Sequence, residues 1–380
     1  RHDPAARALY FQADGQPLAV GTLLRNLELA AVLRRLAKDG SHALQRGPLA
    51  ERIVAEVGKR GGRLTLDDLR DYRPRQREAV CGTYRRWRIC GMPPPSSGGV
   101  TVLQILGLVQ RSGLPSGPPG RPEAIHGFAE AGRLAFADRA RYLGDPEFVK
   151  VPTKQLLAPA YLARRALLMN PDKAMDRAQP GKLVSVMGQA DGDAPELPAT
   201  THLSIVDQAG NAVALTSSIE AVFGSRIQVE GFLLNNQLTD FSLLRESEGL
   251  PVANRAEPGK RPMSSMSPTL VFDASGKLFA VLGSPGGSRI INYVARTLLA
   301  LLDGDMDVAD ALQVGHVGNR NGDTEVELDR VDGATQRQLE ALGHRVRALD
   351  MTSGLHVIVR RNGIWTGAAD PRREGQARGG

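Results

Sequence analysis

One alternating segment organises this chain: Ala199-Thr200-Thr201-His202-Leu203-Ser204-Ile205-Val206-Asp207. From Thr201 onward polar and apolar side chains alternate, as they do in a strand with one buried face. The preceding residues 188–198 combine Pro, Gly and acidic side chains without an apolar period, which predicts a linker. A threonine at such a junction can become a new N-terminus. The segment therefore predicts a strand and, just before it, a candidate nucleophile.

A threonine at a new N-terminus can act as a nucleophile because its own α-amine serves as the base. A hydroxyl is a weak nucleophile until a base accepts its proton. An α-amine titrates at about 7.7–8.0 and a lysine amine at about 10.4, so only the α-amine is a useful base at neutral pH. The Thr200 hydroxyl can create that amine by attacking the Ala199 carbonyl, which gives an ester that water hydrolyses. Taken alone, however, a Thr-Thr pair is explained by strand propensity, so further motifs must decide.

The junction separates a helical part of the chain from a strand-rich part. Apolar spacing and terminal signals predict helices over residues 23–38, 48–59, 65–72, 100–109, 122–142, 161–169, 288–302 and 336–342. Alternation predicts a hairpin over 79–89 and strands over 201–207, 211–216, 232–234, 269–272, 278–282, 345–349 and 355–359. Helices followed by a mostly antiparallel sheet with helices on its outer faces predict an α+β fold.

Composition excludes several classes of function. The chain has 380 residues, 42% of them hydrophobic and 23% charged, which is ordinary for one or two globular domains. The net charge of +7 comes from scattered arginines with few aromatic side chains between them, which argues against nucleic-acid binding. No apolar run approaches the roughly 18 residues of a membrane span. The seven dispersed histidines show no metal-ligand spacing, so we expect neither a metal nor a cofactor.

The two cysteines, Cys81 and Cys90, flank the turn of the predicted hairpin. A disulfide between them is one alternative, but nothing in the sequence fixes the geometry that it needs. Two free thiols are the favoured prediction.

Three further motifs carry groups that a threonine nucleophile needs. Leu282 to Arg289 runs from a strand end through Gly286-Gly287 into a helix, so its amides can form an oxyanion hole, although a plain tight turn explains the motif equally well. Ser264 and Ser265 lie in a proline-bounded loop and can hold a carboxylate, whereas an ordinary serine turn is the simpler reading. Acidic and amide side chains can surround an ammonium group, although singly each fits the solvated surface: Glu220, Gln237 and Asp240.

Together the motifs resemble those of the gamma-glutamyltransferase family, which are self-processing N-terminal-nucleophile hydrolases. The resemblance runs from near Leu9 to the Asp370-Pro371-Arg372 end. It rests on six ordered motifs: Met92 to Gly99, Tyr142 to Pro146, Thr200 to His202, Leu234 to Gln237 with Asp240 to Ser242, Arg261 to Thr269, and Gly283 to Arg289.

The resemblance implies a four-layer αββα sandwich and self-cleavage between Ala199 and Thr200. Residues 1–199 would match the C-terminal part of a large-subunit region and residues 200–380 a small-subunit region, the two interleaved in one fold. The substrate would be glutathione or another γ-glutamyl compound, with transfer to water or to an amino-acid or peptide acceptor. Periplasmic or secreted placement also follows from the resemblance.

The resemblance also implies a role for each candidate residue. Thr200 is the expected nucleophile, and Ser218 stands where a threonine usually bonds it. The oxyanion amides fall on Gly286 and Gly287. The expected contacts to the substrate's α-carboxylate and α-amine are, respectively, Ser264 with Ser265, and Glu220 with Gln237 and Asp240.

Departures from the family pattern leave alternatives open. The family's carboxylate-binding arginine lies upstream of the matched region, so either another basic residue replaces it or, as we expect, the chain is a fragment. Residues 243–260 occupy the place of the family's lid without matching it, so the sequence does not decide between hydrolysis and transpeptidation. In residues 223–226, Arg226 stands in a turn where the family has small residues, which bears on substrate preference. Three rivals remain: a glutaryl β-lactam acylase using Thr200, an unprocessed homologue that binds without turnover, and a serine hydrolase using Ser284, which lacks a G-x-S-x-G elbow.

Overall fold

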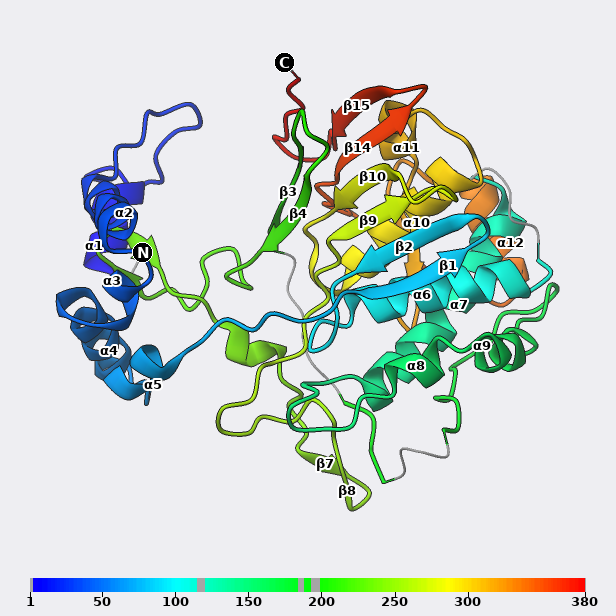
Figure 1. Cartoon of the computed structure of the whole chain (residues 1–380), viewed down its shortest axis with the longest axis horizontal. Coiled ribbons are helices and arrows are strands. Elements are labelled where there is room, and N and C mark those ends of the chain that lie inside the picture. Colours follow the sequence, from blue (N-terminus) through cyan, green and yellow to red (C-terminus); the bar gives the residue numbers. More distant parts are fainter. Residues whose placement is uncertain (1–2, 115–119, 184–187, 193–198, 380) are drawn as a thin grey trace. The chain divides into compact units, whose positions relative to one another are not determined.

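The computed structural model describes residues 3–114, 120–183, 188–192 and 199–379 (Figure 1). The chain forms two compact units, one of Arg1–Arg77 with Ala221–Asn236, the other of Glu78–Glu220 with Gln237–Gly380. Of the predicted linker, residues 193–198 lie outside the described part. Residues 188–192 contain no helix, and Ala190 forms an isolated bridge with Val252.

The smaller unit consists of helices around a small apolar core. Leu49 of α4 and Val32 of α2 are buried in this core. Helix α4 begins at Pro48, as the sequence predicts, because proline suits the first helical turn. The predicted helix over 65–72 begins with a capping box, in which Thr65 and Asp68 hydrogen-bond reciprocally at the start of α5. The elements of this unit are α1 (Pro4–Tyr10), α2 (Leu27–Asp39), α3 (His42–Gln45), α4 (Pro48–Lys59), α5 (Leu66–Asp71), β5 (Gln228–Val229) and β6 (Phe232–Leu233).

The larger unit is organised by a six-stranded sheet in which every neighbouring pair is antiparallel. Its strands, in spatial order, are β1 (Val80–Tyr84), β2 (Trp87–Gly91), β9 (Thr269–Phe272), β10 (Leu278–Gly283), β14 (His356–Arg361) and β15 (Ile364–Ala369). Strands β1 and β2 come from before residue 200 and the others from after it. The two parts of the chain therefore share one sheet (Figure 1).

Helices cover one face of this sheet (Figure 1). Their apolar side chains and those of alternate strand residues form the main core, which includes Leu106 of α6, Val294 of α10 and Leu282 of β10. Helix α7 spans the predicted range 122–142. Among the described residues, none of the helices is both long enough and apolar enough to span a bilayer. The helical elements on this side of the sheet are α6 (Gly98–Arg111), α7 (Pro122–Tyr142), α8 (Thr153–Leu156), α9 (Pro159–Ala166), the 3-10 turn η2 (Gly287–Arg289), α10 (Ile290–Leu302) and α11 (Val308–Gln313).

A hairpin, β3 (Thr201–Val206) with β4 (Ala212–Ser217), covers the other face of the sheet. Because Leu282 faces the helices, the next residue of β10, Gly283, faces away from them. A Cβ on Gly283 would lie 2.2 Å from Cε1 of His202 in β3, so only glycine lets the hairpin approach so closely. Helices, sheet and hairpin are thus consecutive layers. They confirm the predicted α+β class, and they correspond to three consecutive layers, α, β and β, of the expected αββα sandwich.

The buried side of β3 is its polar side. His202 is only 2% exposed, and Ser204 donates to the His356 carbonyl of β14 at 3.1 Å. Leu203 and Ile205 point outward and are 38% and 53% exposed. The predicted strand is confirmed, but Leu203 and Ile205 face away from the sheet.

The hairpin of β1 and β2 corrects the prediction for the cysteines. The structure joins Cys81 to Cys90 in a disulfide, so the expectation of two free thiols is wrong. The two residues lie directly opposite each other in the ladder, with their Cα atoms 4.1 Å apart. The strand register therefore supplies the geometry that the sequence spacing alone did not fix.

A second small sheet packs beside α7. Its strand β12 pairs with β11 in the antiparallel sense and with β13 in the parallel sense. The sequence predicted β13 but not β11 or β12. Its elements, with the remaining ones of the larger unit, are β11 (Val317–Asn319), β12 (Thr324–Glu327), β13 (Val346–Leu349), α12 (Gly333–Ala341), η1 (Gln237–Asp240), β7 (Glu246–Ser247) and β8 (Leu250–Pro251).

Two buried histidines connect this sheet to α7. His126 Nε2 is 2.7 Å from the Asn170 carbonyl, which can only accept, so Nε2 carries the proton. His344 Nε2 then donates to His126 Nδ1 at 2.7 Å, and His344 Nδ1 accepts from the Thr324 hydroxyl at 2.9 Å. His344 is therefore neutral in this arrangement. Burial first, and then the electrostatic influence of His126 and of the Arg133 guanidinium, lowers the pKa of His344 to about 3.

The depressed pKa of His344 predicts acid destabilisation. An unfolded histidine titrates near 6.5, so its neutral folded form contributes full stability above that pH and loses it as the pH falls toward 3. Between pH 7 and pH 5 we expect this group to cost about 2 kcal/mol of unfolding free energy. Urea unfolding of the wild type and of His344→Gln at both pH values measures it. The loss should be smaller in the variant and unchanged in a control, His42→Gln on the exposed surface of α3; equal losses in all three proteins would contradict the assignment.

Candidate active site

The start of β3 and the end of β4 place the candidate nucleophile beside a second hydroxyl. Thr201 pairs with Ser217 in the ladder, so the residues just outside it, Thr200 and Ser218, lie together. Thr200 Oγ1 donates to Ser218 Oγ at 3.2 Å, and Ser218 Oγ donates to the Ala199 carbonyl at 2.8 Å. The predicted partnership of Thr200 and Ser218 is therefore present in the structure.

This chain of hydrogen bonds ends on the carbonyl that a self-cleavage would attack. Negative charge develops on the Ala199 oxygen when a nucleophile adds to its carbon, and a donor already 2.8 Å away stabilises that charge. Ser218 can also accept the Thr200 proton as it gives up its own. The geometry thus supports both activation of the hydroxyl and polarisation of the carbonyl.

The same Ser218 hydroxyl anchors the first of the predicted ammonium ligands. The backbone N–H of Glu220 donates to Ser218 Oγ at 2.9 Å. Glu220 is 3% exposed and has a φ of 73°, in the left-handed region that non-glycine residues rarely adopt. Such backbone strain at a buried acid is typical of functional sites.

The other two predicted ammonium ligands share one 3-10 turn, η1. Asp240 is 6% exposed, and its carbonyl accepts from Asn254 Nδ2 at 2.8 Å. Gln237, at the start of the turn, is half-buried. Their role toward an ammonium group stays a prediction.

The predicted oxyanion glycines follow β10 and begin the helical layer. Gly286 has a φ of 135° and Gly287 a φ of 60°, both in the region that favours glycine. A Cβ on Gly286 would lie 2.6 Å from the Tyr293 ring. No side chain caps the helical turn that begins here, so its first backbone N–H groups have no capping acceptor from a side chain.

Two contacts bring this glycine turn toward Thr200. His202, two residues after Thr200, packs on Gly283, the last residue of β10. Arg373 donates to the Thr200 carbonyl at 3.4 Å. The Arg373 side chain and the ring of Pro285, which precedes the glycines, both pack on Gly354, since a Cβ there would lie 2.9 and 2.7 Å from them.

His202 itself is unsuited to act as a general acid. Its ring nitrogens lie 2.8 Å from Thr216 Oγ1 and 3.1 Å from Ser204 Oγ. Burial, followed by the charge of His356, lowers the pKa of His202 to about 3. The ring is therefore neutral at physiological pH and fills the space between hairpin and sheet.

The serine pair lies against the proline-rich motif rather than in an isolated turn. The backbone N–H and the hydroxyl of Ser97 both donate to the Ser264 carbonyl, at 2.7 and 2.8 Å. Ser265 is 4% exposed and accepts from Nη2 of Arg139 at 2.9 Å. Arg139 was not predicted from the sequence, because it lies 126 positions before Ser265. It also lies in a helix whose apolar pattern accounts for its presence without any functional role.

The rival nucleophile Ser284 is excluded by its surroundings. Its side chain is fully buried, and its hydroxyl donates to the neighbouring Pro285 carbonyl at 2.7 Å and accepts from the Gly354 N–H at 3.3 Å. A hydroxyl in this position supports the loop between β10 and α10 and does not meet a substrate.

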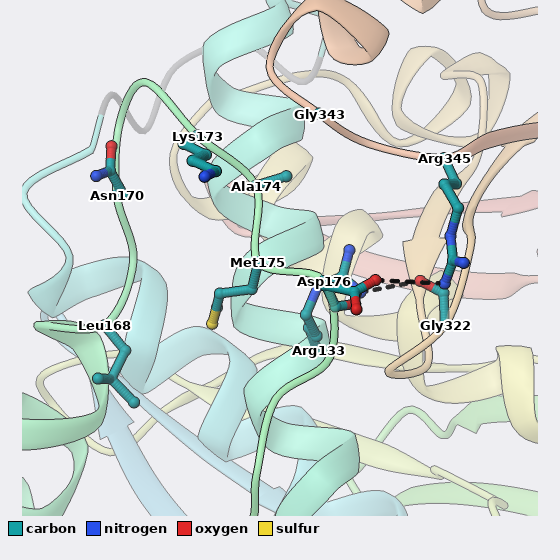
Figure 2. A pocket seen from close by; sticks show the side chains of 10 residues that line it. All are labelled: Arg133, Leu168, Asn170, Lys173, Ala174, Met175, Asp176, Gly322, Gly343 and Arg345. Carbon is teal, nitrogen blue, oxygen red and sulfur yellow. Dashed lines mark hydrogen bonds and ion pairs between the residues drawn. The ribbon is translucent and has the colours of Figure 1, made fainter.

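A cavity of about 470 Å³ lies elsewhere in the larger unit, beside α7 (Figure 2). Three of its charged side chains interact within the protein: Arg345 pairs with Asp176 at 3.6 Å, and Arg133 donates to the carbonyls of Asp176 and Gly322 at 2.6 and 2.9 Å. The described residues that line it include none of the candidate catalytic or binding side chains.

Comparison with known proteins adds three findings. The sequence profile described as Gamma-glutamyltranspeptidase matches residues 1–380. The glutathione hydrolase proenzyme of Escherichia coli (strain K12) is 37% identical over 95% of this chain and 63% of the relative, and that of Bacillus subtilis (strain 168) is 33% identical over 97% and 64%. The acylase ACY 1 proenzyme of Pseudomonas sp. (strain SE83) is 33% identical over 98% and 64%. The chain thus spans somewhat less than two thirds of these relatives.

Solved structures support the same fold. The cephalosporin acylase from Bacillus halodurans superposes with a TM-score of 0.85 at 25% identity, covering 99% of this chain and 67% of that one. The structure of LmbA2991T421A superposes with a TM-score of 0.81 at 27% identity, covering 97% and 70%.

Proposed function

This chain belongs to the gamma-glutamyltranspeptidase family, and on that premise we propose that it is a self-processing γ-glutamyl hydrolase and transferase. Its substrates would be glutathione and related γ-glutamyl amides. The observation that carries the proposal is the hydrogen-bonded series from Thr200 through Ser218 to the Ala199 carbonyl.

Self-cleavage would start from this series. Thr200 Oγ1 attacks the Ala199 carbonyl carbon, its proton passes to Ser218, and Ser218 gives its own proton to the developing oxyanion. The carbon–nitrogen bond then breaks as the carbonyl reforms and the proton from its hydroxyl passes to the nitrogen, which leaves an ester on Thr200 and a free α-amine. Water hydrolyses the ester, and the large-subunit and small-subunit pieces result from one precursor.

Turnover would reuse the same hydroxyl. The new α-amine of Thr200 accepts the hydroxyl proton, and the oxygen attacks the γ-carbonyl of the substrate. The amides of Gly286 and Gly287 stabilise the oxyanion, and the leaving amine takes the proton. The γ-glutamyl ester on Thr200 is resolved by water or by the amine of an amino acid or peptide.

Recognition of the substrate would use both ends of the γ-glutamyl group. Ser264 and Ser265 bind its α-carboxylate, and Glu220, Gln237 and Asp240 surround its α-ammonium. The burial of Glu220 and Asp240 supports this assignment, because a buried acid gains most from a cationic partner.

The disulfide supports the proposal of a periplasmic or secreted location. Disulfides persist in oxidising compartments, and Cys81 and Cys90 are joined in this fold. Fractionation with alkylation of free thiols tests it: a cytoplasmic protein with both thiols alkylated would contradict it.

A glutaryl acylase is the second candidate, favoured by the similarity to ACY 1 and to the cephalosporin acylase structure. A glutaryl group lacks the α-ammonium that Glu220 and Asp240 are proposed to bind. Turnover of γ-glutamyl and glutaryl p-nitroanilides separates the two candidates. Reaction of the glutaryl compound alone would overturn the main proposal.

Denaturing electrophoresis with mass spectrometry of the small piece tests processing directly. A piece that starts at Thr200 supports the proposal, and one that starts at Thr201 moves the nucleophile by one residue. A single intact band would favour the unprocessed homologue.

The position of Ser218 predicts a processing defect when its hydroxyl is removed. Ser218→Ala loses the donor to the Ala199 carbonyl, so we expect cleavage to slow by roughly 10²- to 10³-fold. Ser218→Thr keeps the hydroxyl and should cleave at nearly the wild-type rate. The fraction cut over time, read by electrophoresis, measures both. Ser275→Ala, in the turn between β9 and β10, is the matched control; a normal rate in Ser218→Ala would refute the role.

A further inference from the structure

Arg139, near the end of α7, links two loops that the sequence singled out separately. It is 8% exposed, and its guanidinium Nε donates to Ser97 Oγ at 2.8 Å while Nη2 donates to Ser265 Oγ at 2.9 Å. Ser97 belongs to the proline-rich motif and Ser265 to the serine pair. One buried cation therefore holds a hydroxyl from each loop.

The donor-only character of arginine fixes the direction of these hydrogen bonds. A guanidinium has no acceptor, so both serine hydroxyls must accept from it. The Ser97 proton then goes to the Ser264 carbonyl, 2.8 Å away, which also accepts from the Ser97 N–H at 2.7 Å. Arg139 thus orients Ser97, and Ser97 holds the backbone of Ser264.

The second serine is oriented through its side chain. Because Ser265 Oγ accepts from Arg139, its own proton points away from the guanidinium and can only be donated. The Ser265 carbonyl accepts from Ser267 Oγ at 2.9 Å, which fixes the backbone on the other side. Arg139 and Ser97 therefore hold Ser264 through its backbone carbonyl, and Arg139 orients the Ser265 hydroxyl as a donor.

We propose that Arg139 is a positioning residue for the site that binds the α-carboxylate of the γ-glutamyl group; the inference rests on the function proposed above. It acts through Ser97 and Ser265, whose donated hydrogen bonds it aligns. Arg139 is therefore expected to determine preference for substrates that carry this carboxylate.

Three p-nitroanilides that differ by one group test this inference. γ-Glutamyl anilide has both α-substituents, 4-aminobutyryl anilide lacks the carboxylate, and glutaryl anilide lacks the amine. In Arg139→Gln, the ratio of kcat/KM between the γ-glutamyl and 4-aminobutyryl compounds should fall roughly ten- to hundredfold, chiefly through a higher KM for the former. Arg139→Lys keeps the charge but not the planar guanidinium with its two donors. Its kcat/KM ratio should therefore lie between those of the wild type and Arg139→Gln.

A matched control separates positioning from general stability. Arg133 lies on the same helix and is also buried, but it donates to the carbonyls of Asp176 and Gly322. Arg133→Gln should leave the ratio unchanged, whatever its effect on the melting temperature. If Arg139→Gln does not fold, Ser97→Ala removes the intermediary alone and should lower the same ratio.

The outcomes distinguish this inference from the function on which it rests. An unchanged ratio in Arg139→Gln and Ser97→Ala, with a wild type that prefers the γ-glutamyl compound, overturns the inference alone. An equal loss of kcat/KM for all three compounds would make Arg139 merely structural and overturns it too. A wild type that hydrolyses none of the three, or glutaryl anilide alone, overturns the proposed function instead.

Discussion

Thr200→Ala is expected to leave the chain uncut and to lower γ-glutamyl turnover by roughly 10⁴-fold or more. The variant lacks the oxygen that attacks Ala199, and without the cut no α-amine forms at this position. Both the precursor step and the catalytic step therefore fail together. Electrophoresis of the purified protein measures the first, and release of p-nitroaniline from γ-glutamyl anilide measures the second.

The neighbouring threonine supplies the matched control. Thr201 is the first residue of β3 and its side chain is exposed, whereas Thr200 Oγ1 bonds to Ser218. Thr201→Ala should be cut and active, and Thr200→Ser should be cut because it keeps a hydroxyl in the same place. A Thr200→Ala chain that still yields a piece starting at residue 200 would show that another group performs the cleavage.

The second large effect is expected at the glycine turn. In Gly286→Ala the new Cβ would meet the Tyr293 ring at 2.6 Å, and a φ of 135° is unfavourable for alanine. The backbone must shift, which moves the amides proposed to bind the oxyanion. We expect kcat to fall by roughly 10²- to 10³-fold with a smaller change in KM, because the interaction is made mainly in the transition state. Steady-state kinetics on γ-glutamyl anilide measures both constants.

Gly276 provides the comparison for this variant. It also has a positive φ, 81°, but it lies in the turn between β9 and β10 with nothing within 4 Å of an added Cβ. Gly276→Ala carries similar backbone strain without disturbing the site, so its kcat should remain near that of the wild type. Equal losses in the two variants would mean that strain alone, and not the oxyanion amides, explains the effect.

Long elements with clear terminal signals were predictable from the sequence. Helices α4 and α7 occupy the predicted ranges because Pro48 and Pro122 mark their first turns and an apolar period runs through both. Short elements were predicted less consistently. The four-residue strand β9 was predicted, whereas β11 and β12, with three and four residues, were not. Strand β12 is held between β11 and the later strand β13, a pairing that its own residues do not reveal.

The polarity of β3 shows a different limit. Alternation predicts a strand, but it does not say which face is buried. Here His202 and Ser204 face the sheet because Gly283 leaves room for an imidazole and the His356 carbonyl offers an acceptor. Neither neighbour can be read from the segment itself.

The motifs of the candidate site were predictable from the sequence, but the contacts between them were less so. The partnership of Thr200 with Ser218 was expected from the family resemblance, and the pairing of β3 with β4 across a short turn supplies its geometry. Arg139 could not be found in this way, since its bonds to Ser97 and Ser265 join three distant parts of the chain. Cys81 and Cys90 were misjudged for a related reason, because the register of β1 and β2 brings them opposite.

The shared sheet has a kinetic consequence for the proposed two-chain protein. Strand β2, from before the cut, pairs with β9, from after it, so Cys90 faces Leu270 and Gly91 faces Thr269 in one ladder. The pieces therefore occupy a common framework before the peptide between them breaks. Their association needs no diffusional encounter, and the appearance of the two-chain form should follow first-order kinetics at any protein concentration.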